Sequence, residues 1–240
     1  MSFFSGLFRT TYPINLTGFT DWHCHILPGV DDGVQNMTDS VAILKAYEDA
    51  GIAEVWLTPH IMEDIPNTPE SLMKRFKELQ ECYRGSVKLN LAAENMIDSL
   101  FLERLEKNDL LPIGNDGKTL LVETSYFNAP MKFSETIEAI KSKGYFPLLA
   151  HPERYNYLDS LEDYRRLKAQ GVLFQMNLMS LTGHYGPVVK KKAEELLSEG
   201  MYDRAGSDLH RKEHLDIIRR MKISSSQKNV FNRTFSITTE

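Results

Sequence analysis

The stretch DWHCH at residues 21–25 is followed, after one short loop, by DDG at residues 31–33. Successive side chains of an extended strand point to opposite faces, so His23 and His25 are expected on the same side. Two imidazoles side by side, with a carboxylate near them, make half of a metal site. Two surface histidines on an exposed strand would give the same pattern. The other strands of the chain decide between these alternatives.

Length and composition are those of an ordinary globular protein. The chain has 240 residues, of which 42% are hydrophobic and 25% charged. A net charge of −5 without a basic block disfavours a general nucleic-acid or membrane-surface binder. No hydrophobic run reaches the length of a membrane span, and the N-terminus lacks the basic leader of a signal peptide. Two cysteines are too few for a disulfide framework, which favours a reducing cytoplasm.

Short apolar runs typical of strands alternate with amphipathic helical segments along the chain. Strands are predicted at residues 19–25, 54–58, 87–93, 118–124, 146–150, 172–177 and 203–207. Helices are predicted at residues 38–50, 69–83, 99–107, 134–143, 161–170, 188–198 and 213–221. Consecutive βα units favour parallel strands, because a parallel crossover needs a helix-sized connection. An open doubly wound sheet and a closed barrel both satisfy this pattern.

One domain is predicted over residues 18–222, since no linker or change of composition divides the chain. Residues 1–17 form a leader. Residues 223–240 form a polar, serine-rich tail, whose order the sequence leaves open.

Ligand-type residues close almost every predicted strand. The closing residues are His25, His60, Glu94, Glu123, His151, Asn177 and Asp208. In α/β barrels the carboxyl ends of the strands meet at one mouth, and buried histidines and carboxylates that converge there need a cation. Neighbouring positions add three more donors. The predicted metal ligands are therefore His23, His25, Asp32, His60, Glu94, Glu123, His151, Asp208 and His210.

Each of these residues also has an ordinary explanation. His60 would serve as a loop histidine, Glu94 as a helix-capping carboxylate and Asp208 as an N-cap. Caps and surface histidines have no reason to select every strand end, so the joint pattern favours metal. Nine mixed nitrogen and oxygen donors exceed one coordination sphere and indicate two or three divalent ions. Cys24 alternates away from the histidines and is predicted to be a packing residue.

Short motifs at these strand ends carry a family resemblance. They are His23-x-His25, Asp31-Asp32-Gly33, Thr58-x-His60, Glu94, Glu123, His151-x-Glu153-Arg154-Tyr155 and Ser207-Asp208-x-His210. Together they resemble the PHP (polymerase and histidinol phosphatase) superfamily, and within it the bacterial CpsB/CapC-type tyrosine-protein phosphatases. The resemblance runs from Asp21 to His210, so the leader and the tail fall outside it.

The resemblance implies a single-domain α/β fold, a distorted (β/α)7 TIM-like barrel with a three-metal phosphoesterase site. It implies manganese as the metal, and imidazole with carboxylate ligands is also compatible with iron or zinc. By position it implies one ion on His23, His25, Glu94 and Asp208, a second on Glu94, Glu123 and His151, and a third on Asp32, His60 and His210.

Three further residues are assigned to catalysis. Bound ions would activate a water and neutralise phosphoryl oxygens. Arg154 and Arg211, each next to a predicted ligand, are predicted to clamp the phosphoryl group, with a loop salt bridge as the alternative for either. Asp21 is predicted to orient a histidine, with an ordinary turn carboxylate as the alternative.

The resemblance implies hydrolysis of phosphotyrosine on a protein, namely the tyrosine-rich tail of a membrane-bound kinase controlling capsule or exopolysaccharide export. The phosphatase itself would be soluble and cytoplasmic. A thiol-based mechanism is excluded, because the sixth positions after Cys24 and Cys82 are Val30 and Lys88 rather than arginine. Two alternatives remain: a phosphoesterase for a small histidinol-phosphate-like metabolite, and a non-catalytic metal-binding scaffold. The oligomeric state stays open.

Overall fold

The computed structural model describes residues 11–235. Residues 1–10 and 236–240, which include most of the predicted leader and the end of the tail, lie outside the described residues.

Parallel strands of two sheets form the wall of the structure. Their bounds are β2 (Thr20–Cys24), β3 (Glu54–Leu57), β4 (His60–Ile61), β5 (Lys88–Leu91), β6 (Glu94–Met96), β7 (Thr119–Glu123), β8 (Phe146–Ala150), β9 (Leu173–Asn177) and β10 (Arg204–Gly206). One sheet has the order β10-β9-β8-β7-β6-β4, and the other has the order β2-β3-β5. All of these neighbours pair in parallel, as the βα pattern predicts.

Two of the predicted strands, at residues 54–58 and 87–93, are each followed after a short break by a second strand that was not predicted. Thr58 and Pro59 separate β3 from β4, and two alanines separate β5 from β6. Pro59 has no N–H to donate to a strand ladder, so a break there is expected. After the breaks the pairing continues, and His60 of β4 lies opposite Glu94 of β6. The interruption therefore places two predicted ligands side by side.

The barrel closes where its last strand meets its first. The N–H of Asp208 donates to the carbonyl of His23 at 2.7 Å, and the N–H of His25 donates to the carbonyl of Leu209 at 2.8 Å. With the broken strands counted once, seven βα units complete the circle. The predicted distorted barrel is confirmed, and the open doubly wound sheet is ruled out.

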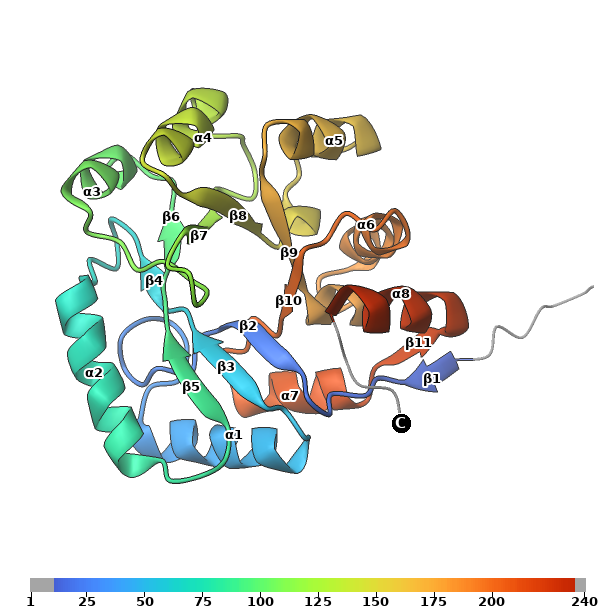
Figure 1. The fold of residues 1–240 in the computed structure, drawn as a ribbon. Helices are drawn as coiled ribbons and strands as arrows, with labels where there is room; N and C mark the ends of the chain where they lie inside the picture. Colours follow the sequence, from blue (N-terminus) through green and yellow to red (C-terminus); the bar gives the residue numbers. More distant parts are fainter. Residues whose placement is uncertain (1–10, 236–240) are drawn as a thin grey trace, which may run out of the picture.

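Helices form an outer ring around the strands (Figure 1). Their bounds are α1 (Met37–Asp49), α2 (Pro69–Cys82), α3 (Phe101–Lys107), α4 (Phe133–Ser142), α5 (Leu161–Ala169), α6 (Pro187–Ser198) and α7 (Lys212–Arg219), with 3-10 turns η1 (Pro152–Arg154) and η2 (Leu178–Thr182). All seven predicted helices are present within two residues of their predicted ends. Local capping explains several starts: Asn36 accepts from the N–H of Asp39, and Thr68 and Ser160 form capping boxes.

Strand β7 is buried on both faces. Leu120 and Val122 of β7 belong to the main core beneath the helices, whereas Leu121 belongs to a smaller cluster with Trp56 and Leu148. This alternation assigns the smaller cluster to the barrel interior. Apolar side chains therefore fill the barrel and leave its mouth for polar groups.

The two ends of the described chain pack together. β1 (Thr11–Pro13) pairs antiparallel with β11 (Lys222–Ser224), and α8 (Ser225–Phe235) follows at once. Phe231 of α8 is fully buried and stacks on Phe19, with 6.4 Å between ring centroids. Residues 225–235 of the polar tail therefore form a helix that contributes to the same core.

Phe231→Ala tests the contribution of α8 to the fold. We expect the free energy of unfolding to fall by about 3–5 kcal/mol, because the substitution leaves a cavity in a close-packed core. Urea unfolding followed by circular dichroism measures the change. Phe127→Ala is the matched control, since Phe127 is 73% exposed and its loss should cost little. Equal losses in the two variants would contradict a core role for Phe231.

Candidate metal centre

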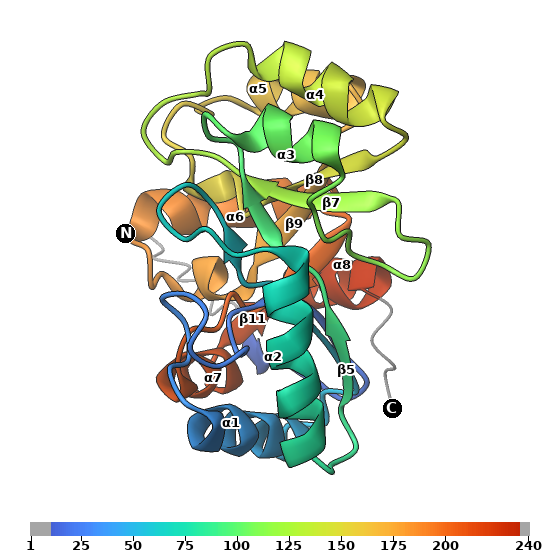
Figure 2. The ribbon, with the colours of Figure 1, turned by 90° about the vertical axis from the view of Figure 1, so that its left-hand side faces the viewer.

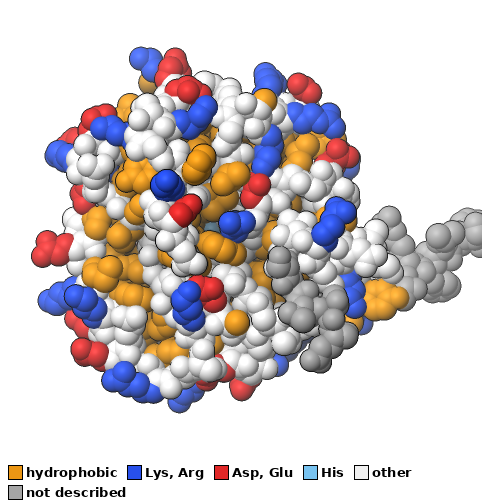
Figure 3. All heavy atoms as spheres, in the orientation of Figure 1, with side chains coloured by type: hydrophobic (Ala, Val, Ile, Leu, Met, Phe, Trp, Pro, Cys, Tyr) orange, Lys and Arg blue, Asp and Glu red, His pale blue; other side chains and the backbone are white. Residues whose placement is uncertain are grey.

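The nine predicted ligands all lie at the end of the barrel where the strands terminate. In Figure 2 the loops that leave these strand ends gather on the left, and the loops that enter the strands lie on the right. Six of the nine side chains are buried: His23, His25, Glu94, Glu123, His151 and Asp208. His60 and His210 are partly exposed, and Asp32 is exposed. Figure 3 shows the opposite face, where charges of both signs are scattered between apolar side chains.

The side chains of His23, in β2, and His25, just after it, point together, as strand alternation predicts. Their Nε2 atoms are 3.1 Å apart. The Nδ1 atom of His23 lies 2.8 Å from Oε1 of Gln175, and the Nδ1 atom of His25 lies 2.8 Å from Oδ2 of Asp31. Because both oxygens can only accept, each Nδ1 carries the hydrogen. In the neutral rings the two Nε2 lone pairs therefore face each other.

Carboxylate oxygens face the same point. Oε2 of Glu94 lies 3.2 Å from Nε2 of His23 and 3.3 Å from Nε2 of His25. Oδ1 of Asp208 lies 3.6 Å and 3.4 Å from the same two nitrogens. Lone pairs that converge in a buried site repel one another unless a cation or protons lie between them. Two ligands about 2.1 Å from one ion and at right angles are about 3 Å apart, so this donor set fits a divalent metal.

A second group of donors gathers around Glu94 and Glu123. Nδ1 of His60 is 2.9 Å from Oε1 of Glu123, yet both atoms are buried without a hydrogen-bond partner among the described residues. Nε2 of His151 is 3.0 Å from Oε1 of Glu94, and its Nδ1 is a further buried atom that has no hydrogen-bond partner within residues 11–235. Buried nitrogen and oxygen atoms that lie this close together without a hydrogen bond are expected where the atoms bind a common metal ion.

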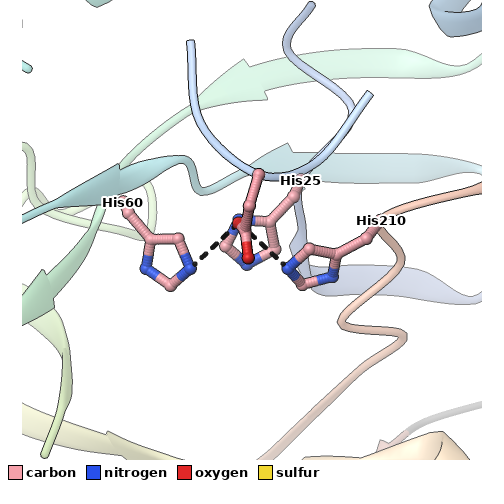
Figure 4. A group of neighbouring side chains, drawn as sticks. His25, His60 and His210 are labelled. Carbon is pink, nitrogen blue, oxygen red and sulfur yellow. Dashed lines mark ion pairs between the residues drawn. The ribbon is translucent and has the colours of Figure 1, made fainter. Parts of the chain in front are cut away.

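Asp32 lies between two histidines at the outer edge of the centre. Its Oδ1 is 3.5 Å from Nε2 of His60 and 3.5 Å from Nε2 of His210 (Figure 4). Nδ1 of His210 donates to the carbonyl of Asp208 at 2.9 Å, which leaves Nε2 free to bind. His25 stacks on His210, with 4.0 Å between ring centroids.

His60 adjoins both groups, with Nδ1 facing the glutamates and Nε2 facing Asp32. A neutral imidazole has one free lone pair, so His60 binds on one side only. The resemblance places it with Asp32. The geometry would also allow Nδ1 of His60 to bind an ion together with Glu94 and Glu123. The assignment of His60 to one ion is therefore a proposal.

Without metal the centre would hold protons. Burial alone would raise the pKa of Asp208, but His23 and His25 outweigh it and hold that pKa well below its ordinary value. Burial alone would lower the pKa of His60, yet the neighbouring Glu123 and Glu94 carboxylates raise it to about 9. Metal binding must displace such protons, so proton release should accompany it.

Comparison with known proteins gives the family. The family model described as "Capsular polysaccharide synthesis, CpsB/CapC" matches residues 19–234. The chain belongs to the CpsB/CapC family. The matched region includes all nine predicted ligands and most of α8, which extends the similarity beyond His210, where the sequence motifs end.

Two relatives and one solved structure show how far the likeness of this CpsB/CapC-family protein extends. Tyrosine-protein phosphatase YwqE of Bacillus subtilis is 28% identical over 195 residues, 79% of this chain and 76% of that protein. Tyrosine-protein phosphatase CpsB of Streptococcus pneumoniae is 28% identical over 200 residues, 79% of this chain and 82% of that protein. A crystal structure from work on YwqE and CpsB, called unique metal-dependent tyrosine phosphatases, superposes with a TM-score of 0.75 at 25% identity. It covers 91% of this chain and 88% of the other.

The structure adds residues that hold the histidines in place. Gln175 orients the His23 ring and Asp31 orients the His25 ring. Asp21, predicted to orient a histidine, accepts from the main-chain N–H groups of His23 and Ser207, at 3.3 Å and 2.7 Å. It therefore supports the backbone of β2, whose register shifts between Asp21 and Cys24, and its other carboxylate oxygen accepts from the Tyr47 hydroxyl of α1.

Two predicted ligands have strained backbones. His151 has φ of 34° and Asp208 has φ of 50°, in the left-handed region that L-residues rarely adopt. Such conformations persist only where surrounding structure enforces them, and they concentrate at functional sites.

The two predicted arginines line a cavity of about 490 Å³ at the mouth, together with Tyr126, Tyr185 and His184. Nη1 of Arg154 donates to Oδ2 of Asp208 at 2.8 Å. Nε of Arg211 donates to Nε2 of His214 at 3.0 Å. Both guanidinium groups therefore border the space in which a phosphate ester would meet the metal centre.

Asp31→Asn tests the support of the histidine pair. We expect metal affinity to fall by about 10–100-fold, because the neutral amide polarises the His25 ring less than the carboxylate does. Metal titration followed by elemental analysis measures the change. Asp116→Asn, in an exposed loop near the start of β7, is the control and should bind metal normally. Unaltered metal affinity in Asp31→Asn would show that Asp31 does not support metal binding by His25.

Proposed function

We propose that this protein is a metal-dependent protein-tyrosine phosphatase that hydrolyses phosphotyrosine with a metal-activated water. The observation that carries the proposal is the convergence of buried histidine and carboxylate lone pairs at one barrel mouth, beside a cavity bordered by Arg154. Membership of the CpsB/CapC family and the named activities of YwqE and CpsB support the substrate class.

The residues of the centre have two proposed roles, metal binding and phosphoryl binding. Divalent ions, manganese before iron or zinc, would supply an activated water and neutralise phosphoryl oxygens when bound. His23, His25, Glu94 and Asp208 would hold one ion, and the remaining ligands would hold one or two more. Arg154 and Arg211 would bind phosphoryl oxygens at the mouth, where guanidinium N–H groups match an oxyanion.

The proposed substrate is the tyrosine-rich tail of a membrane-bound tyrosine kinase that regulates capsule or exopolysaccharide production. The family description, which concerns capsular polysaccharide synthesis, supports this choice. We propose that the enzyme acts in the cytoplasm, where such a tail would lie. None of the helices in residues 11–235 has the length and apolar character needed to cross a membrane.

Turnover of phosphotyrosine peptides by the manganese-loaded protein tests the proposal. Activity should be lost on chelation and in the double variant His151→Ala with Asp208→Ala. A parallel panel of phosphorylated metabolites tests the alternative substrate class. Faster turnover of a histidinol-phosphate-like metabolite, or peptide hydrolysis that survives chelation, would overturn the proposal. Full metal occupancy with no hydrolysis of either class would indicate the non-catalytic scaffold.

A further inference from the structure

The guanidinium of Arg154 lies over two aromatic rings. Its guanidinium carbon lies 4.5 Å from the ring centroid of Tyr126 and 4.2 Å from that of Tyr185. Only 18% of its side chain is exposed. Two aromatic rings and the burial of the side chain therefore limit how the guanidinium can move and leave little of it to meet a ligand.

Hydrogen bonds fix one of the two rings. The side-chain amide of Asn177 donates to the Tyr185 hydroxyl at 3.1 Å and to Oδ2 of Asp208 at 2.7 Å. That same carboxylate oxygen accepts from Nη1 of Arg154. One hydrogen-bonded network therefore joins the Tyr185 hydroxyl, the Asn177 amide, the Asp208 carboxylate and the Arg154 guanidinium. The other oxygen of Asp208 faces His23 and His25.

Packing fixes the second ring. Tyr126 stacks against Tyr155, with 5.8 Å between centroids, and lies 5.7 Å from the ring of His151. Tyr155 is fully buried and stacks in turn on Tyr157. The Tyr126 ring therefore cannot swing away from Arg154 without disturbing a row of aromatic side chains.

The participants come from four successive strand ends. Tyr126 follows β7, Arg154 lies in η1 after β8, Asn177 closes β9 with Tyr185 beyond it, and Asp208 follows β10. A lone arginine beside a metal-ligating carboxylate would fold onto that carboxylate and satisfy its N–H groups there. Contact with the rings restricts it, and within residues 11–235 its guanidinium donates one hydrogen bond, from Nη1 to Asp208, which leaves the other N–H groups for an oxyanion.

We propose that Tyr126 and Tyr185 are positioning residues that hold the Arg154 guanidinium in the plane needed to bind the phosphoryl oxygens of a phosphate monoester. The inference rests on the proposed phosphatase function. It assigns the rings to the arginine rather than to a slot for the substrate's aromatic ring, because the guanidinium already covers one face of each.

Binding of inorganic phosphate to the manganese-loaded protein tests the clamp without requiring turnover. Calorimetric affinities for phosphate, together with KM and kcat on a phosphotyrosine peptide, are compared for Tyr126→Leu, Tyr185→Leu and Tyr126→Phe. We expect each leucine variant to weaken phosphate binding by about fivefold to tenfold and to raise KM similarly, as loss of one stacking face implies. Tyr126→Phe keeps the ring and should bind like the wild type, and metal content should not change.

Arg154→Lys keeps the charge but cannot stack between two rings, so it supplies an independent measure. In an Arg154→Lys background the leucine substitutions should have no further effect on phosphate affinity. Should a leucine variant lose its fold or its metal, Arg154→Lys alone supplies the test: it keeps the charge without the stacking, so phosphate affinity equal to that of the wild type would overturn the proposal. Three further results would overturn the proposal. They are leucine substitutions that keep their full effect in the Arg154→Lys background, equal losses in Tyr126→Phe and Tyr126→Leu, and no binding of phosphate by the wild type. Phosphate binding that follows these expectations without hydrolysis of phosphotyrosine would instead refute only the proposed function.

Discussion

Glu94→Gln should lose both bound metal and phosphatase activity, with kcat falling on the order of a thousandfold. Glu94 lies at the centre of the site, with Oε2 near His23, His25 and His60 and Oε1 near His151. Metal ions stabilise developing charge by several kcal/mol, and a loss of about 4 kcal/mol corresponds to about a thousandfold in rate. Steady-state turnover of a phosphotyrosine peptide and elemental analysis measure the two losses together.

The fold should survive this substitution, because glutamine has the same shape and removes a buried charge. Glu135→Gln, on the exposed first turn of α4, is the matched control and should retain metal and activity. Wild-type activity in Glu94→Gln, or a full complement of metal with lost activity, would contradict a ligand role for Glu94.

Removal of the metal should abolish activity and make the fold sensitive to alkaline pH. In the metal-free protein the pKa of His60 is raised to about 9, above the ordinary 6.5. A histidine whose pKa is higher in the folded protein than in the unfolded chain stabilises the fold. This stabilisation is complete at a pH below the pKa of the unfolded chain, and it is lost as the pH rises through the pKa of the folded protein. The shift corresponds to roughly 3 kcal/mol, lost between about pH 6.5 and about pH 9.

Urea unfolding of metal-free and manganese-loaded protein, from about pH 6 to about pH 10, measures this dependence. The stability gained on adding manganese should increase across that range, because the ion replaces protons that alkaline solution removes. His60→Gln should flatten the metal-free profile. If the stability of the metal-free protein instead rises with pH over this range, protonated histidines do not stabilise the buried carboxylates.

Much of the fold could be predicted because its signals are local. Each βα unit carries its own periodicity and its own stop, so the helices fall within two residues of their predicted ends. Closure of the barrel follows less directly. It depends on main-chain bonds between the ends of β10 and β2, whose donors and acceptors carry no side-chain signature.

The predicted ligands converge because parallel strands end at one rim, whatever their separation along the chain. The residues that support them left weaker signals. Gln175 lies 152 positions from His23, and its only local signature is an amide within a buried strand. Asp31 belongs to the DDG motif, but the sequence of a loop does not show which imidazole its carboxylate meets, and the predicted ligand in this motif is Asp32.

The terminal segments show the limit of composition as a guide. Polar, serine-rich sequence lowers the expectation of order, yet one buried ring on α8 anchors the segment. Its partner Phe19 lies at the other end of the chain, so local pattern could not reveal the contact. The same separation hides the pairing of β1 with β11.

The most direct test is anomalous diffraction from crystals grown with manganese and inorganic phosphate. We expect two or three metal peaks about 2.0–2.2 Å from the nitrogen and oxygen donors named above, with Glu94 contacting more than one ion. A phosphate should bridge these ions and accept hydrogen bonds from Arg154. Metal bound elsewhere, or phosphate bound away from Arg154 and the nine ligands, would contradict the account.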